Sequence, residues 1–144
     1  CLQLKSEQDD LTQLKDDLLQ REAQIDARNQ EIIARAQVEM KRCEFAAAIQ
    51  LLSTIPAESQ TATTQGLLTQ LNGLADRLKT VLSTANGFLK EQRYKEAVTY
   101  LDNYSRQIEM AGLRDKKLKK FLEDTRAKLK AQSLAKLQHP PYSP

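Results

Sequence analysis

The residues of this chain that could bind a metal or act in catalysis are few and widely spaced. Cys1 and Cys43 lack the paired spacing of zinc ligands, and the single histidine, His139, stands in a polar tail. The adjacent aspartates at 9–10 and 16–17 belong to a helix surface, where water solvates them. We therefore expect no metal site, and we interpret Cys43 as a small, semi-buried residue of a turn. A disulfide between chains through Cys1 is the alternative in an oxidising compartment.

Catalytic motifs are also missing. An enzyme needs converging groups, such as a nucleophile beside a base, carboxylates with shifted pKa values, or a metal with an open position. The sequence has no glycine-rich phosphate loop, no HExxH metal motif and no serine in a nucleophile elbow. We therefore predict a protein that is not an enzyme and that uses neither a cofactor nor a small-molecule substrate.

The composition is typical of long helices. Of the 144 residues, 28% are charged and 5% are aromatic, with 4 glycines, 4 prolines and no tryptophan. No stretch reaches the roughly 18 apolar residues of a membrane span, and the N-terminus lacks the basic-then-apolar pattern of a signal peptide. We expect one soluble, cytoplasmic, all-α domain. Because the chain begins at Cys1 and not at Met, we also expect it to be a segment of a longer protein.

Breaks in the hydrophobic periodicity divide the chain into about five helices. The stretch from about 6 to 42 contains no glycine or proline, and this predicts a single helix of roughly 50 Å. A turn at Cys43 and Glu44 follows. The short second helix then ends near Pro56, because a proline disfavours helical angles in the residue before it.

A second long helix is predicted over about 58–91, with Ser59 or Thr61 as its N-cap. Gly73 and Gly87 lie inside it, where each costs roughly 1 kcal/mol relative to alanine. We interpret these two glycines as sites at which another helix packs closely.

The last part of the chain holds two more helices and a tail. After a turn at Glu91 to Arg93, the fourth helix begins at Tyr94 and ends at Gly112, which forms a left-handed cap. A basic fifth helix covers about 113–137. The final run HPPYSP is expected to be a flexible tail, with a short linear motif as the alternative.

The strongest pattern is an internal repeat with a spacing of 49 residues. ARAQVEMKRCEFAAAIQLL, from Ala34 to Leu52, aligns with STANGFLKEQRYKEAVTYL, from Ser83 to Leu101. In each unit an aromatic residue opens the second helix, and an alanine three residues later allows the two helices to approach closely. The predicted core of the repeat is Phe45, Ala48 and Leu52 in the first unit and Tyr94, Ala97 and Leu101 in the second.

At these positions the sequence resembles the tetratricopeptide helical hairpin, whose second helix also begins aromatic-x-x-Ala. The spacing is longer than the roughly 34 residues of that repeat, and the Trp and the Leu-Gly of its first helix are missing. CEFAAAIQLLSTIP and RYKEAVTYL are also similar to the helical regions that accompany kinase domains in some large bacterial serine/threonine kinases. That resemblance implies a regulatory or docking extension of a multidomain signalling protein.

The first helix carries a coiled-coil-like pattern on one face. Apolar residues recur every seven positions at Leu4, Leu11, Leu18, Ile25 and Ile32. The positions three residues further on hold only one apolar residue, Leu14, whereas a strong isolated coiled coil needs both sets. We therefore expect this helix to pack partly on its own domain and to meet a partner helix at its exposed end, with a homodimer as one candidate.

The two ends of the chain differ in charge, since residues 1–31 are rich in acids and residues 113–137 in bases. The predicted electrostatic surface of the last helix is Lys116, Lys117, Lys119, Lys120, Arg126, Lys128 and Lys130. These side chains could contact nucleic acid or anionic lipid, or they could complement the acidic first helix within one molecule or between copies. We favour a solvated surface, because acidic residues interrupt the run.

Together these patterns predict a non-catalytic protein–protein interaction or scaffolding module that binds another protein or another domain of its parent chain. An electrostatic tether to nucleic acid or membrane is the alternative function. We expect an acidic, coiled-coil-like start over 1–31, a hairpin-repeat domain over 32–137 and a tail over 138–144. Within the repeat domain, the hairpins cover about 32–55 and 81–111.

Overall fold

The computed structural model describes the backbone of residues 2–138 and the side chains of residues 7–137. Cys1, the side chain of Leu4 and the run from His139 to Pro144 lie outside these described residues. The described chain contains five α-helices, a short 3₁₀ helix and no strand. Their bounds are α1 Leu2–Lys41, α2 Phe45–Ser53, η1 Ala57–Ser59, α3 Ala62–Lys90, α4 Tyr94–Met110 and α5 Lys116–Gln138. The prediction of an all-α protein with a long N-terminal helix is confirmed.

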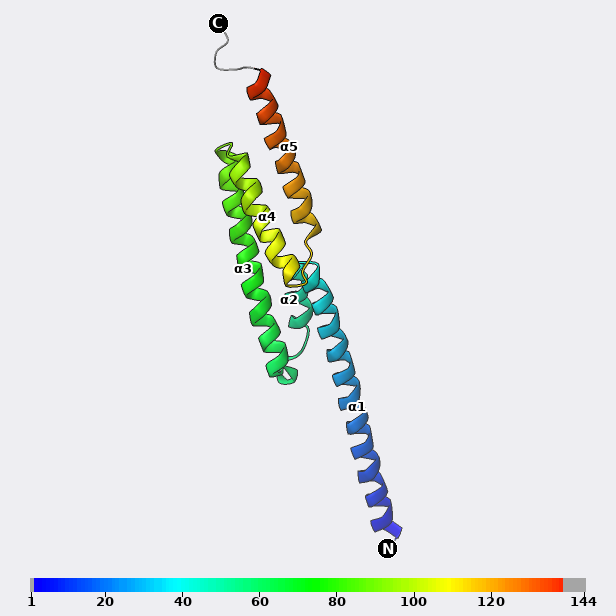
Figure 1. Cartoon of the computed structure of the whole chain (residues 1–144). Coiled ribbons are helices and arrows are strands. Elements are labelled where there is room, and N and C mark those ends of the chain that lie inside the picture. Colours follow the sequence, from blue (N-terminus) through cyan, green and yellow to red (C-terminus); the bar gives the residue numbers. More distant parts are fainter. Residues whose placement is uncertain (1, 139–144) are drawn as a thin grey trace.

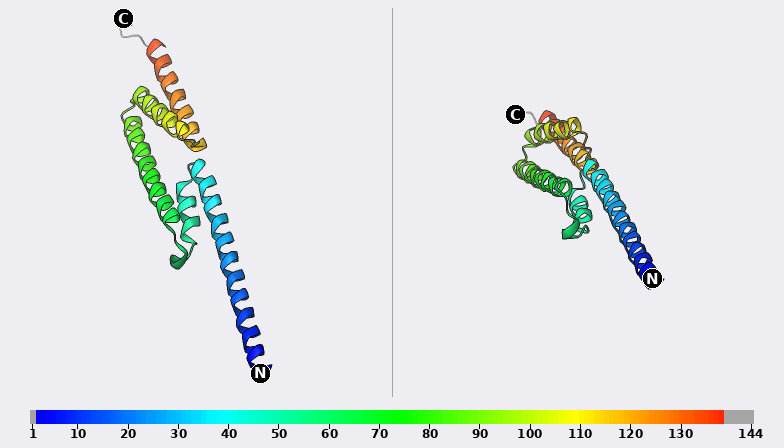
Figure 2. Two further views of the ribbon diagram at one scale, coloured as in Figure 1. Left: turned by 60° about the horizontal axis from the view of Figure 1, so that its bottom comes forward. Right: turned by 90° about the horizontal axis from the view of Figure 1, so that it is seen from below.

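Each helix packs on the next one along the chain, so α3 contacts α2 of the first hairpin as well as α4 of its own hairpin. Figures 1 and 2 show that α1 and α5 leave a common junction and extend in opposite directions. At this junction the backbone N–H of Arg114 donates a hydrogen bond of 2.7 Å to the carbonyl oxygen of Lys41. The start of α5 is therefore tied to the end of α1.

The two turns of the repeat have the same backbone geometry. Cys43 and Gln92, which are 49 residues apart, both adopt left-handed angles, with φ values of 61° and 59°. The N–H groups of Glu44 and Arg93 then bond back to carbonyl oxygens five residues earlier, at 2.9 and 2.8 Å. This is the Schellman arrangement, which satisfies carbonyl groups at a helix end. Both turns predicted from the sequence are confirmed.

The other predicted helix ends are also present. Gly112, with φ of 82°, ends α4, and the N–H of Leu113 closes this turn at 2.8 Å. At the start of α3, Thr61 and Thr64 form a reciprocal capping box in which each side chain accepts from the other residue's backbone N–H, at 3.3 and 2.8 Å. Thr61 is therefore the N-cap, whereas Ser59 ends η1.

Equivalent positions of the two repeat units are buried in the same way. Small residues lie where the helices cross, and a leucine follows one turn later in each second helix. The fully buried pairs, each at 0% exposure, are Ala36 and Ala85, Ala48 and Ala97, and Leu52 and Leu101. Phe45 is also buried. The similarity between the two sequences thus reflects equivalent packing positions within one core.

Tyr94 departs from the predicted core, because it is only partly buried. Its counterpart Phe45 lies near α3 and the start of α5, and with them it lines a groove described below. Tyr94 begins α4 at the tip of the α3–α4 hairpin, where fewer elements can cover it (Figure 1). The aromatic position is therefore a core position in the first unit only.

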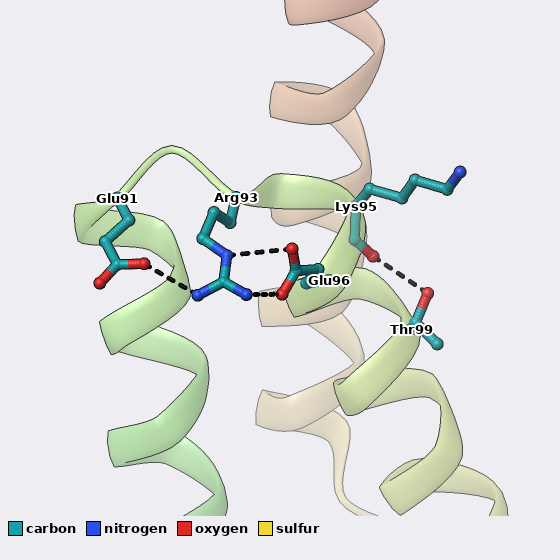
Figure 3. A network of polar contacts seen from close by, with 5 residues as sticks. All are labelled: Glu91, Arg93, Lys95, Glu96 and Thr99. Atoms are coloured by element: carbon teal, nitrogen blue, oxygen red, sulfur yellow. Dashed lines mark hydrogen bonds and ion pairs between the residues drawn. The ribbon is translucent and has the colours of Figure 1, made fainter.

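A polar network fixes the α3–α4 turn (Figure 3). The guanidinium of Arg93 donates to Glu91 at 2.9 Å and, through two nitrogens, to the carboxylate of Glu96. The hydrogen bonds that Arg93 donates, first to Glu96 and then to Glu91, raise the pKa of Arg93 above its ordinary value. The guanidinium also lies over the ring of Phe88, 4.9 Å from its centroid. Arg93 therefore joins the last turn of α3 to the first turn of α4.

The interpretation of Gly73 and Gly87 as helix-packing sites was wrong. Both residues are exposed, and a Cβ atom built on either one would have no neighbour within 4 Å. The packing surface of α3 is instead formed by larger side chains: Leu67, Leu71, Val81 and Ala85.

Replacement of Gly73 by alanine is expected to stabilise the protein by about 0.5–1 kcal/mol. The added methyl group meets no other atom, and alanine loses less backbone entropy in a helix than glycine does. Chemical denaturation followed by circular dichroism would measure the change. Gly112→Ala is the matched control and should destabilise, because its φ of 82° strains any residue with a Cβ. A loss of stability in Gly73→Ala would contradict this account of α3.

Candidate interaction surfaces

A row of exposed apolar side chains lies on the projecting part of α1. Every residue from 7 to 28 is exposed, so this part of the helix contacts no other element. Four large side chains there share one face: Leu11 is 59% exposed, Leu14 57%, Leu18 50% and Ile25 48%. We call these four residues the α1 stripe. Leu19, 63% exposed, lies on a neighbouring face.

The α1 stripe continues the face with which α1 packs on its own domain. At about 100° per residue, the four stripe residues, Ile32 and Ala36 fall within an arc of about 60°. Ala36 is fully buried, and Ile32 packs against the core. One helix face is thus covered near the junction and bare beyond it. Of the predicted interaction residues, Leu11, Leu18 and Ile25 are exposed as expected. Leu14, the one apolar residue in the second set of heptad positions, was not among the predicted interaction residues, although it lies on the same face.

Charged residues flank the α1 stripe on both sides. At 100° per residue, Asp10, Asp17, Arg21 and Arg28 lie along one edge of the stripe. Lys15 and Glu22 lie along the other edge. All six are exposed, and none of them takes part in a salt bridge among the described residues. Acids and bases thus alternate along a bare apolar face.

The predicted electrostatic surface of α5 is partly engaged within the molecule. Lys117 lies 3.5 Å from Glu44, and Lys119 lies 2.8 Å from Glu109. The Lys119 ammonium lowers the pKa of the Glu109 carboxyl, chiefly through their hydrogen bond. Arg126 lies 3.1 Å from Asp102. Several bases of α5 therefore hold it against α4 and α2, and exposed ion pairs of this kind are each worth about 0–1 kcal/mol.

The suggestion that basic α5 pairs with the acidic start of α1 inside one molecule was wrong. The two segments extend from the junction in opposite directions (Figures 1 and 2). The N-terminal part of α1 is exposed on every side from residue 7 to 28. Pairing between these charges can arise only between different molecules.

A groove at the junction collects bases from two distant parts of the chain. It has a volume of about 710 Å³ and lies between the end of α1 and the start of α5. Its basic residues are Lys41, Arg42, Arg114, Lys116 and Lys117. The groove also contains Glu44 and Asp115, so its charge is partly balanced. The contribution of Lys41 and Arg42 to this groove was not predicted from the sequence, because they lie more than 70 positions before α5.

A second groove, of about 560 Å³, lies between α3 and α5 next to the start of α2. Its apolar walls include Ala75, Leu78 and Leu82 of α3 and Leu118 and Phe121 of α5. It is open to solvent and therefore offers space for apolar side chains. Leu118 belongs to the buried core, whereas Ala75, Leu78, Leu82 and Phe121 are partly buried side chains packed against it.

Cys43 is the one described residue with a strongly shifted pKa. Burial, followed by the nearby carboxylates of Asp115 and Glu44, raises the pKa of its thiol from the ordinary 9.0 to about 12. Asp115 itself caps α5 by accepting a hydrogen bond of 3.0 Å from the N–H of Leu118. The Cys43 thiol is thus protonated at neutral pH and is a poor nucleophile and metal ligand.

In a Cys1→Ser chain, the folded protein is expected to react with Ellman's reagent at pH 8 on the order of 100–1,000-fold more slowly than the urea-unfolded chain. The reason is the smaller thiolate fraction, together with burial of the sulfur. Because the folded pKa is the higher one, this thiol's contribution to stability is present below about pH 9 and is lost as the pH rises toward about 12. Equal rates for folded and unfolded chains would contradict this account.

Within the described residues, no three histidine, cysteine, aspartate or glutamate side chains gather where they could hold a metal ion. Nor is any helix in this part of the chain sufficiently long and apolar to cross a membrane. Comparisons with models of known protein families, with curated proteins and with solved structures found no match.

Proposed function

We propose that this chain is a non-catalytic protein–protein interaction module, in which a hairpin body supports a projecting helix that binds a partner. The observation that carries this proposal is the α1 stripe, a row of large apolar side chains that are each about half exposed to solvent. Leaving such a row in water is unfavourable by about 25 cal/mol for each Å² of apolar surface. A partner helix that covers the stripe recovers this free energy.

Two further proposals concern the family likeness of the helical hairpins and the larger protein to which they belong. We propose that the two 49-residue units are tetratricopeptide-like hairpins, a likeness supported by their shared turn geometry and by the crossing alanines Ala48 and Ala97. We also propose that the module serves in a larger signalling protein, as the resemblance to helical extensions of bacterial kinases implies. Both proposals agree with a body that acts as a support, because its matched residues are used in packing.

A photo-crosslinking residue placed at position 14 would test the proposed function in the protein's own cells. Position 14 lies on the stripe, whereas position 20 lies on the opposite, polar side of α1 and is the matched control. We expect a discrete crosslinked protein from position 14 and none from position 20. The adduct should be lost in a Leu11→Glu, Leu18→Glu chain that still folds. Identical results from positions 14 and 20 would contradict the proposal.

The alternative function, an electrostatic tether, has support of its own from the basic groove at the junction. Lys41, Arg42 and Arg114 add to the bases of α5 there, and anionic phosphates would be attracted to such a cluster. The acids within the groove and the ion pairs of Lys117, Lys119 and Arg126 weaken that attraction. We therefore expect neither nonspecific duplex DNA nor phosphatidylserine vesicles to bind at low salt. Salt-sensitive binding to either one would favour the tether.

A further inference from the structure

We propose that the partner of the α1 stripe is the α1 stripe of a second copy of this chain, packed antiparallel with Leu14 facing the partner's Ile25. This inference rests on the proposed function and names its partner. It follows from three features of the projecting helix: the continuity of its apolar face with the core, the order of the charges along its edges, and its length beyond the body.

The apolar face sets the type of contact. Ile32 and Ala36, on the same face of α1, already pack against a helix of their own domain. The stripe is the continuation of this helix-packing surface. Another helix is therefore the occupant that fits it, and the second copy offers a helix with the same narrow apolar face.

Antiparallel pairing follows from the residues between the apolar ones. Arg21 and Arg28 lie three residues beyond Leu18 and Ile25, at the second seam of the heptad pattern. In a parallel, in-register pair each arginine would face its own copy across the seam, and like charges would repel. In the antiparallel pair Leu18 faces the partner's Arg21, and Leu11 faces the partner's Arg28.

The charges along the edges select the register. In an antiparallel pair, the same edge of each helix lies on the same side of the dimer. With Leu14 opposite the partner's Ile25, Arg21 comes within one residue, about 1.5 Å along the axis, of the partner's Asp17.

Two further pairs follow from the same register. Arg28 comes equally close to the partner's Asp10 along the same edge, and Lys15 comes within two residues, about 3 Å along the axis, of the partner's Glu22 on the other edge. Two-fold symmetry makes each of these pairs occur twice. The apolar stripe supplies the burial, and the charges favour this register over others.

The length of the projection leaves room for this dimer. The overlap of the exposed parts of the two helices runs from residue 11 to residue 28, about 26 Å of helix, and α1 meets its own body only beyond it, where Ile32 packs against the core. The two bodies therefore lie at opposite ends of the paired helices. Since the contact uses the same surface on both chains, it closes as a dimer and does not extend into a filament.

Sedimentation equilibrium over a dilution series is the first test. We expect a monomer–dimer equilibrium, with the dissociation constant raised at least about tenfold in Leu18→Glu and little changed in Gln20→Glu, which adds the same charge on the polar side. Both variants should keep the helical content of the parent chain, because neither side chain is buried. A strict monomer at the highest soluble concentration would overturn the inference. The photo-crosslink from position 14 to a different protein would still leave the proposed function standing.

Charge reversal and disulfide trapping test the orientation. Arg21→Glu should weaken the dimer by placing an acid beside the partner's Asp17, and adding Asp17→Lys to the same chain should restore it. In a Cys1→Ser background, oxidation should crosslink a mixture of Leu14→Cys and Ile25→Cys chains much faster than either chain alone. Efficient crosslinking of each single variant with itself would indicate a parallel dimer and overturn the inference.

Discussion

Truncation of Leu101 to alanine is expected to lower the free energy of unfolding by about 2–5 kcal/mol. Leu101 is a fully buried residue of α4, and it belongs to a single core cluster that spans both repeat units. Removal of its three terminal carbon atoms loses apolar burial and leaves a cavity that close-packed neighbours fill only in part. Urea denaturation followed by circular dichroism at 222 nm, the usual helix band, would measure the loss.

Two controls make this measurement specific. Leu134→Ala removes the same atoms from an exposed site on α5 and should change the stability by less than about 0.5 kcal/mol. Leu52→Ala, at the equivalent site of the first unit, should cost about as much as Leu101→Ala and shift the same transition, because one core joins both units. Separate transitions for the two variants would show that the units unfold independently and would contradict the single core.

Enlargement of Ala97 to leucine is expected to destabilise the protein by about 1–3 kcal/mol. Ala97 is fully buried near the start of α4, so a larger side chain must displace α4 from its neighbours or adopt a strained rotamer. Ala48→Leu, at the equivalent crossing of the first unit, should have a similar effect. The melting temperature and the urea midpoint would both report the change.

Ala131→Leu is the matched control for this enlargement. The residue is exposed on α5, and the substitution should leave the stability within about 0.5 kcal/mol of the parent chain. An unchanged stability in Ala97→Leu would contradict the role of the small residue in the helix crossing. It would also remove the physical reason for the aromatic-x-x-Ala pattern in the two units.

Local patterns in the sequence predict the helices and most of their ends. The turn at Cys43, the cap at Thr61 and the left-handed position at Gly112 all occur where the sequence predicted them. These features depend on residues within one or two helical turns of each other, so their signals are local. The repeat also determined the buried crossings at Ala48 and Ala97, since one packing solution was used twice.

The surfaces depended on tertiary structure, because they combine residues that are far apart in the chain. Gly73 could not be assigned to an exposed face without knowing which side of α3 meets its neighbours. The difference in burial between Tyr94 and Phe45 could not be predicted without knowing which helices cover each ring. The basic groove joins Lys41 to Arg114 only because a long-range hydrogen bond brings those segments together.

The projecting helix illustrates both contributions. The regular spacing of its apolar residues was visible in the sequence, but the same spacing occurs in helices whose apolar face is covered and in helices whose apolar face is exposed. Only the fold decided that the face is covered at Ala36 and bare at Leu18. The physical reason is the difference in length: α2, which packs on α1, is a helix of 9 residues and covers only the junction end of the 40-residue α1.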